Sequence, residues 1–312
     1  MKPSTLEQQP AEIQSDTAWC GPVRLFVRKL EPYFWVAPAF CVLFVFTHLP
    51  ILLEGVLGLL AADGFSPPRF IGLQNYLEVL LDQDFWLAIW HNVIYAVATV
   101  AGKVVLSFLL AVLLNQRLFG RNILRTVLFL PVVLSFVAIG VIWTLFFNFD
   151  HGVLNATLNV LGPQGLKHDW LGSADTALGA VIFVDIWKWT GFHLVIYLAG
   201  LQSIPTDLYE AALIDGANAW QRFWRITVPL LQPFTAINVL LASLGAFSVF
   251  DLVYVMTQGG PFNATNVAML EIYLQAFQFN RLGYAGAMSV VLLALVAAMS
   301  IVILRITKAK TD

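Results

Sequence analysis

Residues 206–233 read TDLYEAALIDGANAWQRFWRITVPLLQP, a mainly polar stretch between two long apolar runs. Pro205 closes the run before it, because proline interrupts a helix that precedes it. Thr206 can cap the first turn of a new helix, and Asp207 then lies near the positive end of the helix dipole. The stretch therefore begins a separate helix outside the preceding run.

Two short helices account for this stretch. The first is expected from about Leu208 to Asp215, and Gly216 can adopt the left-handed conformation that ends a helix. The second is expected from Ala219 to Pro229. The sequence thus predicts a helix-turn-helix at 206–233, between the two apolar runs.

The flanking sequence is that of a membrane protein. Hydrophobic residues make up 59% of the chain and charged residues 12%, about half the charge of a typical soluble chain. A helix needs about 20 mainly apolar residues to cross the bilayer core. Runs of that length lie at about 33–53, 89–114, 124–147, 177–201, 236–256 and 285–304. The expected fold class is therefore all-α, a polytopic membrane protein with six transmembrane helices.

Basic residues set the expected orientation, because Lys and Arg concentrate in cytoplasmic segments. The predicted outer loops hold three of them: Arg69, Lys167 and Arg281. The predicted inner segments hold the following: Lys2, Arg24, Arg28, Lys29, Arg117, Arg121, Arg125, Arg222, Arg225, Arg305, Lys308 and Lys310. Both termini are therefore expected in the cytoplasm. The net charge of -2 gives no indication of nucleic-acid binding, and none is expected.

Residues 1–32 are expected to form a separate cytoplasmic part. Residues 1–20 are polar and predict a loose tail. Apolar residues then recur at helical spacing opposite three basic ones, which predicts a short amphipathic helix on the membrane surface. The apolar set is Val23, Phe26, Val27 and Leu30, and the basic set is Arg24, Arg28 and Lys29. The transmembrane domain is then expected at 33–312.

The helix-turn-helix carries a spaced motif. The triplet Glu-Ala-Ala at 210–212 is followed after three residues by Gly216, after nine more by Ile226, and then by Pro229. This pattern resembles the EAA loop of permeases in binding-protein-dependent ATP-binding-cassette importers, with Val228 where the family usually has Leu. Such a loop transmits force. The ATPase can move the membrane helices only through a rigid part of the permease that docks on the surface of the ATPase. The resemblance implies a coupling helix that includes Glu210, Ala211, Ala212, Asp215 and Gly216.

Further stretches narrow the resemblance to the sugar-permease branch, which includes maltose-type and glycerol-phosphate-type systems. They are FIGLQNY at 70–76, RTVLFLP at 125–131 with Trp143, AGLQSIP at 199–205, and MTQGGP at 256–261 with Thr265. The resemblance implies the type I importer permease fold in a bacterial inner membrane. It also implies three kinds of partner: two ATPase subunits, a second homologous permease, and an extracytoplasmic solute-binding protein.

No GxxxxGK[ST] phosphate loop occurs in the chain. ATP and Mg²⁺ are therefore expected on the ATPase subunits, and no cofactor or metal is expected in this chain. Catalytic patterns such as GxSxG, HExxH and CxxC do not occur either. This disfavours a membrane-embedded enzyme.

Ionisable residues inside the spans mark a candidate solute path, because charge within a membrane is costly. Asp185 and Lys188 in the fourth span share a helix face and can neutralise each other. Trp189 and Phe192 add ring faces, a mixture that suits a sugar, and this part of the span lines the solute site in maltose-type relatives. Two interpretations stay open: lining of the solute site, and a structural charge pair. Lys103 in the second span is assigned no function.

The fifth span adds candidates of the same kind. Phe247, Ser248 and Asp251 combine a ring, a hydroxyl and a carboxylate. Phe247 belongs to a stripe at helical spacing with Phe250 and Tyr254, and helix packing is the alternative explanation for such a stripe. The predicted substrate-binding set is Asp185, Lys188, Trp189, Phe192, Phe247, Ser248 and Asp251.

The expected function is translocation of an oligosaccharide, polyol or glycosyl-polyol by an ATP-binding-cassette permease subunit. A glycerol-phosphate permease is an alternative: Lys188 leaves it open, and the nearby Asp185 disfavours it by repelling phosphate. An ion-coupled secondary transporter is a second alternative. It would leave the EAA segment without a purpose, and six spans are few for that class.

Overall fold

The computed structural model describes residues 33–116, 119–161 and 167–308. Packing divides the chain into two units, residues 1–53 and 54–312, which are described separately. The tail and amphipathic helix predicted at 1–32 lie outside the described residues.

The first apolar run forms one helix from Tyr33 to Leu57, 25 residues long with a mean hydropathy of 2.2. It contains a π-helical turn, η1 (Phe44–His48), which continues into α2 (Leu49–Leu57). The Nδ1 of His48 lies 3.2 Å from the carbonyl oxygen of Leu43. A helix of this length is sufficient to cross a bilayer.

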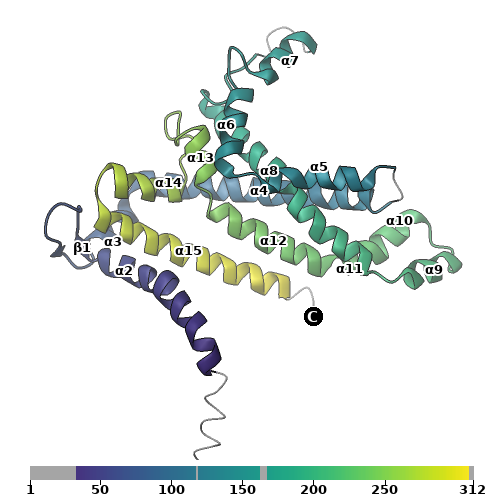
Figure 1. Cartoon of the computed structure of the whole chain (residues 1–312), viewed down its shortest axis with the longest axis horizontal. Coiled ribbons are helices and arrows are strands. Elements are labelled where there is room, and N and C mark those ends of the chain that lie inside the picture. Colours follow the sequence, from purple (N-terminus) through teal and green to yellow (C-terminus); the bar gives the residue numbers. More distant parts are fainter. Residues whose placement is uncertain (1–32, 117–118, 162–166, 309–312) are drawn as a thin grey trace, which may run out of the picture. The chain divides into compact units, whose positions relative to one another are not determined.

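Three further helices are also long and apolar enough to cross a membrane: α4 (Gln83–Leu114), α8 (Ala174–Ser203) and α15 (Leu282–Lys308). The carboxylate of Asp82 caps α4 by accepting from the backbone N–H groups of Asp84 and Phe85. The helices α4 and α8 pack against each other, and α12 (Gln232–Phe247) packs on α4 (Figure 1). These three helices position the polar residues of the candidate site.

The third apolar run is broken. It forms α5 (Arg121–Val133) and α6 (Phe136–Phe146), whose axes meet at 103°. Pro131 lies inside α5 and lacks a backbone donor, and the hydroxyl of Ser135 accepts from the N–H of Ala138 to start α6. The run predicted as one span at 124–147 is thus two helices.

The run predicted at 236–256 is interrupted as well. The helix α12 ends at Phe247, and α13 (Asp251–Met256) begins after a three-residue break. Before α12 the chain forms α10 (Ala219–Arg222), a π-helical turn η2 (Phe223–Thr227) and α11 (Val228–Leu230). The segment 219–230 is bent by 57° from α12. The described residues therefore hold four unbroken candidate spans, or six when each bent pair counts as one.

Shorter elements surround these helices. The stretch after α2 forms a small antiparallel pair, β1 (Leu60–Ala61) and β2 (Arg69–Phe70), followed by α3 (Gln74–Leu81). Further along lie α7 (Val153–Leu161), α14 (Ala268–Tyr273) and a third π-helical turn, η3 (Leu274–Gln278). In the loop between the strands, Asp63 accepts from the backbone N–H groups of Phe65 and Ser66, which holds the pKa of its carboxyl below the usual value.

Apolar clusters hold the second unit together. One joins α4, α6, α8, α12 and α13, and a second joins the ends of α4 and α8 to Leu231 before α12. Gly191 allows a close approach between α5 and α8, because a Cβ there would lie 2.1 Å from the carbonyl oxygen of Leu128. The packing of α5 on α8 therefore requires a residue without a side chain at position 191.

Candidate functional site

The exposed helix α9 (Thr206–Ile214) forms the first half of the predicted helix-turn-helix. Pro205 occupies its N-cap position, and Thr206 is the first helical residue without a side-chain bond to the helix start. The prediction that Thr206 caps this helix is therefore wrong by one position. Asp207 lies in the first turn, as predicted, where a negative charge favours the dipole.

The end of α9 and the start of α10 follow the sequence prediction. Gly216 has a φ of +76°, and the N–H of Ala217 donates to the carbonyl of Ala212 at 2.9 Å, which is the bond that closes a Schellman ending. Asn218 and Gln221 then form a reciprocal capping box at the start of α10. The second helix predicted at 219–229 is divided by the π-helical turn η2.

The predicted coupling residues lie on the surface. Glu210, Ala211, Asp215 and Gly216 are exposed and Ala212 is partly buried. A hydrogen bond between Tyr209 Oη and Thr227 Oγ1, 2.8 Å apart, joins α9 to η2. The structure therefore presents a short exposed helix that is fastened to the helix leading into α12.

A buried ion pair joins α4 to α8. Lys103 Nζ lies 2.5 Å from Asp185 Oδ2, and the two side chains are 3% and 5% exposed. Asp185 therefore pairs with Lys103 and not with Lys188, the partner considered in one of the two interpretations left open, because the helix packed on α8 supplies a nearer cation. Sequence reasoning assigned Lys103 no partner, since nothing in a single sequence states which spans are neighbours.

Lys188 instead reaches the end of α5. Its ammonium group donates to the carbonyl oxygens of Pro131 at 3.2 Å, Val132 at 3.3 Å and Leu134 at 2.6 Å. It also lies 4.7 Å from the centre of the Phe136 ring. The last carbonyls of a helix lack intrahelical partners, and a cation there also favours the helix dipole. Lys188 therefore stabilises the 103° break between α5 and α6.

The predicted aromatic candidates fall into two groups. Trp189 and Phe192 on α8 are partly buried, with ring centres 5.6 Å apart, and Trp189 lies 6.1 Å from Phe136. Phe247 at the end of α12 packs on the cluster that joins α4, α6, α8, α12 and α13. Phe136 packs on this same cluster and so connects the two groups.

The polar candidates of the fifth run lie at the break between α12 and α13. Ser248 is exposed, and its hydroxyl donates to the carbonyl of Leu244 at 3.0 Å. Asp251 is exposed and is the first residue of α13. Each therefore keeps polar atoms available to a ligand.

Sequence reasoning missed Tyr273 of α14. Its ring lies 5.1 Å from Phe250 and 5.4 Å from Tyr254, and these two rings stack at 5.4 Å. The three rings pack around the same cluster as Phe247. The repeat of Tyr273 and Phe277 at helical spacing was a signal for this face, but it does not reveal that α14 returns to α13.

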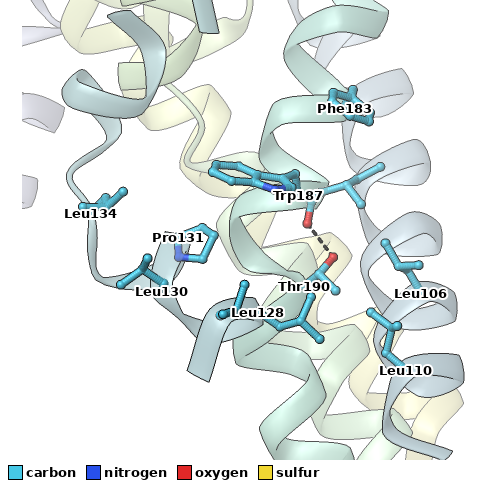
Figure 2. Close-up of a pocket in the computed structure, with 11 residues that line it drawn as sticks. Leu106, Leu110, Leu128, Leu130, Pro131, Leu134, Phe183, Trp187 and Thr190 are labelled. Atoms are coloured by element: carbon cyan, nitrogen blue, oxygen red, sulfur yellow. Dashed lines mark hydrogen bonds between the residues drawn. The ribbon is translucent and has the colours of Figure 1, made fainter. Parts of the chain in front are cut away.

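A cavity of about 450 Å³ lies on another face of α8 (Figure 2). It is lined by Trp187 and Thr190 of α8, Leu106 and Leu110 of α4, and residues of α5 around Pro131. Thr190 donates to the carbonyl of Ile186 at 2.6 Å and so offers no free donor. Helical spacing places this apolar lining roughly opposite Asp185 and Phe192.

The sequence comparisons agree with this architecture. Residues 103–309 match the family described as "Binding-protein-dependent transport system inner membrane component". The chain belongs to this family. The matched residues include the buried ion pair between Lys103 and Asp185, the helix α9, and the break between α5 and α6 that Lys188 contacts. They also include the aromatic residues of α8, α12, α13 and α14. The permease therefore carries all of these features inside the family domain.

Two relatives extend the similarity over most of the chain. The permease is 37% identical over 283 residues to the probable ABC transporter permease protein YurN of Bacillus subtilis, covering 90% of this chain and 97% of the relative. It is also 37% identical over 284 residues to the trehalose/maltose transport system permease protein MalF of Thermococcus litoralis, covering 90% and 94%.

A solved structure shares the fold. It belongs to a bacterial ABC transporter involved in the import of the acidic polysaccharide alginate, and it aligns with a TM-score of 0.81 at 22% identity. The alignment covers 94% of this chain and 100% of that chain. The permease therefore has the all-α fold of an importer subunit, as the sequence predicted, and it is a multi-pass component of the inner membrane.

Proposed function

We propose that this chain is the permease subunit of an ATP-driven importer that carries a sugar or sugar-like solute across the inner membrane. The observation that carries the proposal is the exposed helix α9, which presents Glu210 and Ala211 at the surface and is fastened through Tyr209 to η2. A small residue at 211 allows a partner to approach the backbone closely. Force applied to α9 then passes to η2 and on to α12.

The partners follow from this mechanism and from family membership. Two ATPase subunits bind ATP and Mg²⁺ and close on α9, a second homologous permease completes the pathway, and a solute-binding protein delivers the solute from outside. Both termini lie in the cytoplasm, as does α9. The basic residues concentrated in the predicted inner segments support this orientation.

The solute site draws on α8, α12 and α13. Trp189, Phe192 and Phe247 supply ring faces for the C–H surface of a sugar, while Ser248 and Asp251 supply hydroxyl and carboxylate groups. Asp185 and Lys188 hold the surrounding helices through Lys103 and through the end of α5. The name of the Thermococcus litoralis relative supports a sugar as the solute class.

A neutral solute fits better than glycerol phosphate. Lys103 and Lys188, the two lysines buried in the described spans, already contact a carboxylate and backbone carbonyls. A phosphate there would have to displace those partners. Competition for uptake of a labelled neutral sugar tests this choice. Unlabelled neutral oligosaccharides or polyols are expected to inhibit that uptake, and glycerol phosphate is expected to have no effect on it.

The coupling role is tested by the Ala211→Trp substitution. A bulky ring at this exposed position is expected to abolish both uptake and co-purification of the ATPase subunits. The matched control is Leu81→Trp, at the end of α3, where the side chain is 82% exposed and far along the chain from α9. The control is expected to retain the ATPase subunits. Continued uptake by Ala211→Trp in cells without the ATPase would instead indicate an ion-coupled carrier.

A further inference from the structure

The segment from α10 to η2 presents two large rings outward. Trp220 is 69% exposed and Trp224 is 50% exposed, and their ring centres lie 5.5 Å apart in an edge-to-face arrangement. Arg225, the next residue, is also exposed. Indole rings at a surface are costly in water but favourable where an apolar layer meets a polar one.

Other residues of the same segment pack on the helices of the second unit, and the ring of Phe223 also lies 6.3 Å from that of Trp220 and 5.3 Å from that of Trp224. The ring of Phe223 lies 6.0 Å from Phe108 of α4, and Ile226 packs on the cluster that joins the ends of α4 and α8. Thr227 is buried and bonded to Tyr209. This packing holds the segment against the second unit and leaves the two indoles exposed.

The bend before α12 sets the depth of the tryptophans. Trp224 precedes Gln232, the first residue of α12, by eight positions, or about 12 Å along a helix. Because the segment is inclined by 57° to α12, that length advances only about 6–7 Å along the α12 direction. The headgroup layer on each side of a bilayer is about 5–8 Å thick. The segment and α12 are together long and apolar enough for one bent span, so Trp220 and Trp224 lie near the end of that span, where indole rings favour the membrane interface.

The charge of Arg225 indicates what kind of ligand this surface binds. The ion pairs formed by the described residues are Lys103–Asp185, Lys167–Asp150 and Arg281–Glu78, so Arg225 is in none of them. A guanidinium group binds phosphate through two parallel hydrogen bonds. An exposed arginine beside two exposed indoles therefore matches a phosphate group above an acyl layer.

We propose that Trp220, Trp224 and Arg225 form an anchor that binds anionic phospholipid headgroups at the membrane surface. The two indoles lie between the headgroups and the tops of the acyl chains, and Arg225 binds the lipid phosphate. The anchor fixes the angle of the segment that joins α9 to α12. It requires membrane insertion but no solute and no nucleotide, so it can be tested apart from transport.

The first experiment measures the environment of residue 224. In the full chain with Cys20→Ser and Cys41→Ala, the variants Trp224→Cys and Trp220→Cys are labelled with the fluorophore NBD. Each is reconstituted into equimolar phosphatidylcholine and phosphatidylglycerol vesicles. The matched control is Ile214→Cys on α9, where the side chain is 87% exposed. Labels at 220 and 224 are expected to be quenched by nitroxide lipids and shielded from iodide, whereas the label at 214 is quenched by iodide.

The second experiment measures lipid preference. Nitroxide phosphatidylglycerol is expected to quench the label at 220 more strongly than nitroxide phosphatidylcholine does. Arg225→Gln is expected to reduce the retention of phosphatidylglycerol on the purified protein about five-fold, and Arg225→Lys to preserve most of it. The proposal is overturned if iodide reaches 220 and 224 as readily as 214. It is also overturned if shielding requires the ATPase subunits or a second permease, since the surface is then a protein interface.

Discussion

Lys103 of α4 and Asp185 of α8 form an ion pair, with 2.5 Å between Nζ and Oδ2, and both side chains are almost fully buried. Burial of two charges is tolerated only because each neutralises the other. The pair therefore fixes the position of α8 along α4, the two helices that pack most extensively in the second unit.

Removal of one partner of this pair is expected to destabilise the permease strongly. Asp185→Asn and Lys103→Met each leave a single buried charge, which costs roughly 3 kcal/mol. The double variant Lys103→Met with Asp185→Asn removes both charges and is expected to recover most of that stability. Unfolding of the purified protein in detergent, followed for the four members of this cycle, measures the coupling.

The control is the ion pair between Lys167 and Asp150, whose side chains are 32% and 68% exposed. Asp150→Asn is expected to change stability by less than about 1 kcal/mol. Equal effects of Asp150→Asn and Asp185→Asn would show that the buried pair has no special role.

Lys188 is expected to act on the helix break rather than on the solute. Lys188→Met removes three donors from the carbonyls at the end of α5, and buried carbonyls without partners cost roughly 1–3 kcal/mol. The variant is therefore expected to unfold more readily, with an unchanged order of preference among solutes. Thermal unfolding and uptake competition check the two parts. Unchanged stability with altered solute preference would assign Lys188 to the solute site.

Hydropathy was sufficient to predict where most helices lie but not how they are broken. The helices α4 and α8 coincide closely with the predicted spans, because long apolar runs have one solution in a bilayer. The break at Leu134 depends on Pro131, Ser135 and the distant Lys188 together. Lys188 lies more than 50 residues beyond the other two in the sequence, so its contact with the break could not be read from the third run itself. The third run was therefore expected to be a single span.

The local structure of the helix-turn-helix at 206–233 was predictable because its signals are local. Gly216 and the capping box of Asn218 act within a few residues of their own positions. The candidate solute site was predictable only as a list of residue types. The partner of Asp185 and the contact between Tyr273 and Phe250 arise from helix packing over long sequence separations, and a single sequence carries no record of that.

Gly191 is expected to tolerate no larger residue. A methyl group there would lie 2.1 Å from the Leu128 carbonyl, so α5 and α8 would have to separate. Gly191→Ala is expected to cost roughly 1–3 kcal/mol. Gly179 on the same helix has no atom within 4 Å of the corresponding position, and Gly179→Ala is expected to be neutral or to stabilise α8 by about 0.5–1 kcal/mol. Unfolding measurements on the two variants compare them directly, and equal stabilities would contradict the close approach.

Gly216 is expected to matter through its backbone alone. Its φ is +76° and nothing lies within 4 Å of the position that a Cβ would take, so a substitution there meets strain without a clash. Gly216→Val is expected to distort the end of α9 and to reduce both uptake and ATPase association. Gly216→Asn is the control, because Asn tolerates this conformation. Co-purification of the ATPase subunits with each variant is the measurement, and an equal loss for both would point to side-chain size instead.

Tyr273 is expected to shape the solute site through its ring. It contacts Phe250 and Tyr254, and an aromatic pair contributes about 0.5–1.5 kcal/mol beyond its burial. Tyr273→Ala is therefore expected to raise the KM for uptake about two- to ten-fold, with the ATPase subunits still bound. Tyr273→Phe keeps the ring and is expected to stay close to the parent protein. Because α14 and α9 belong to separate parts of the fold, a Tyr273→Ala variant that loses the ATPase while keeping its KM would show that this aromatic group supports coupling and not solute binding.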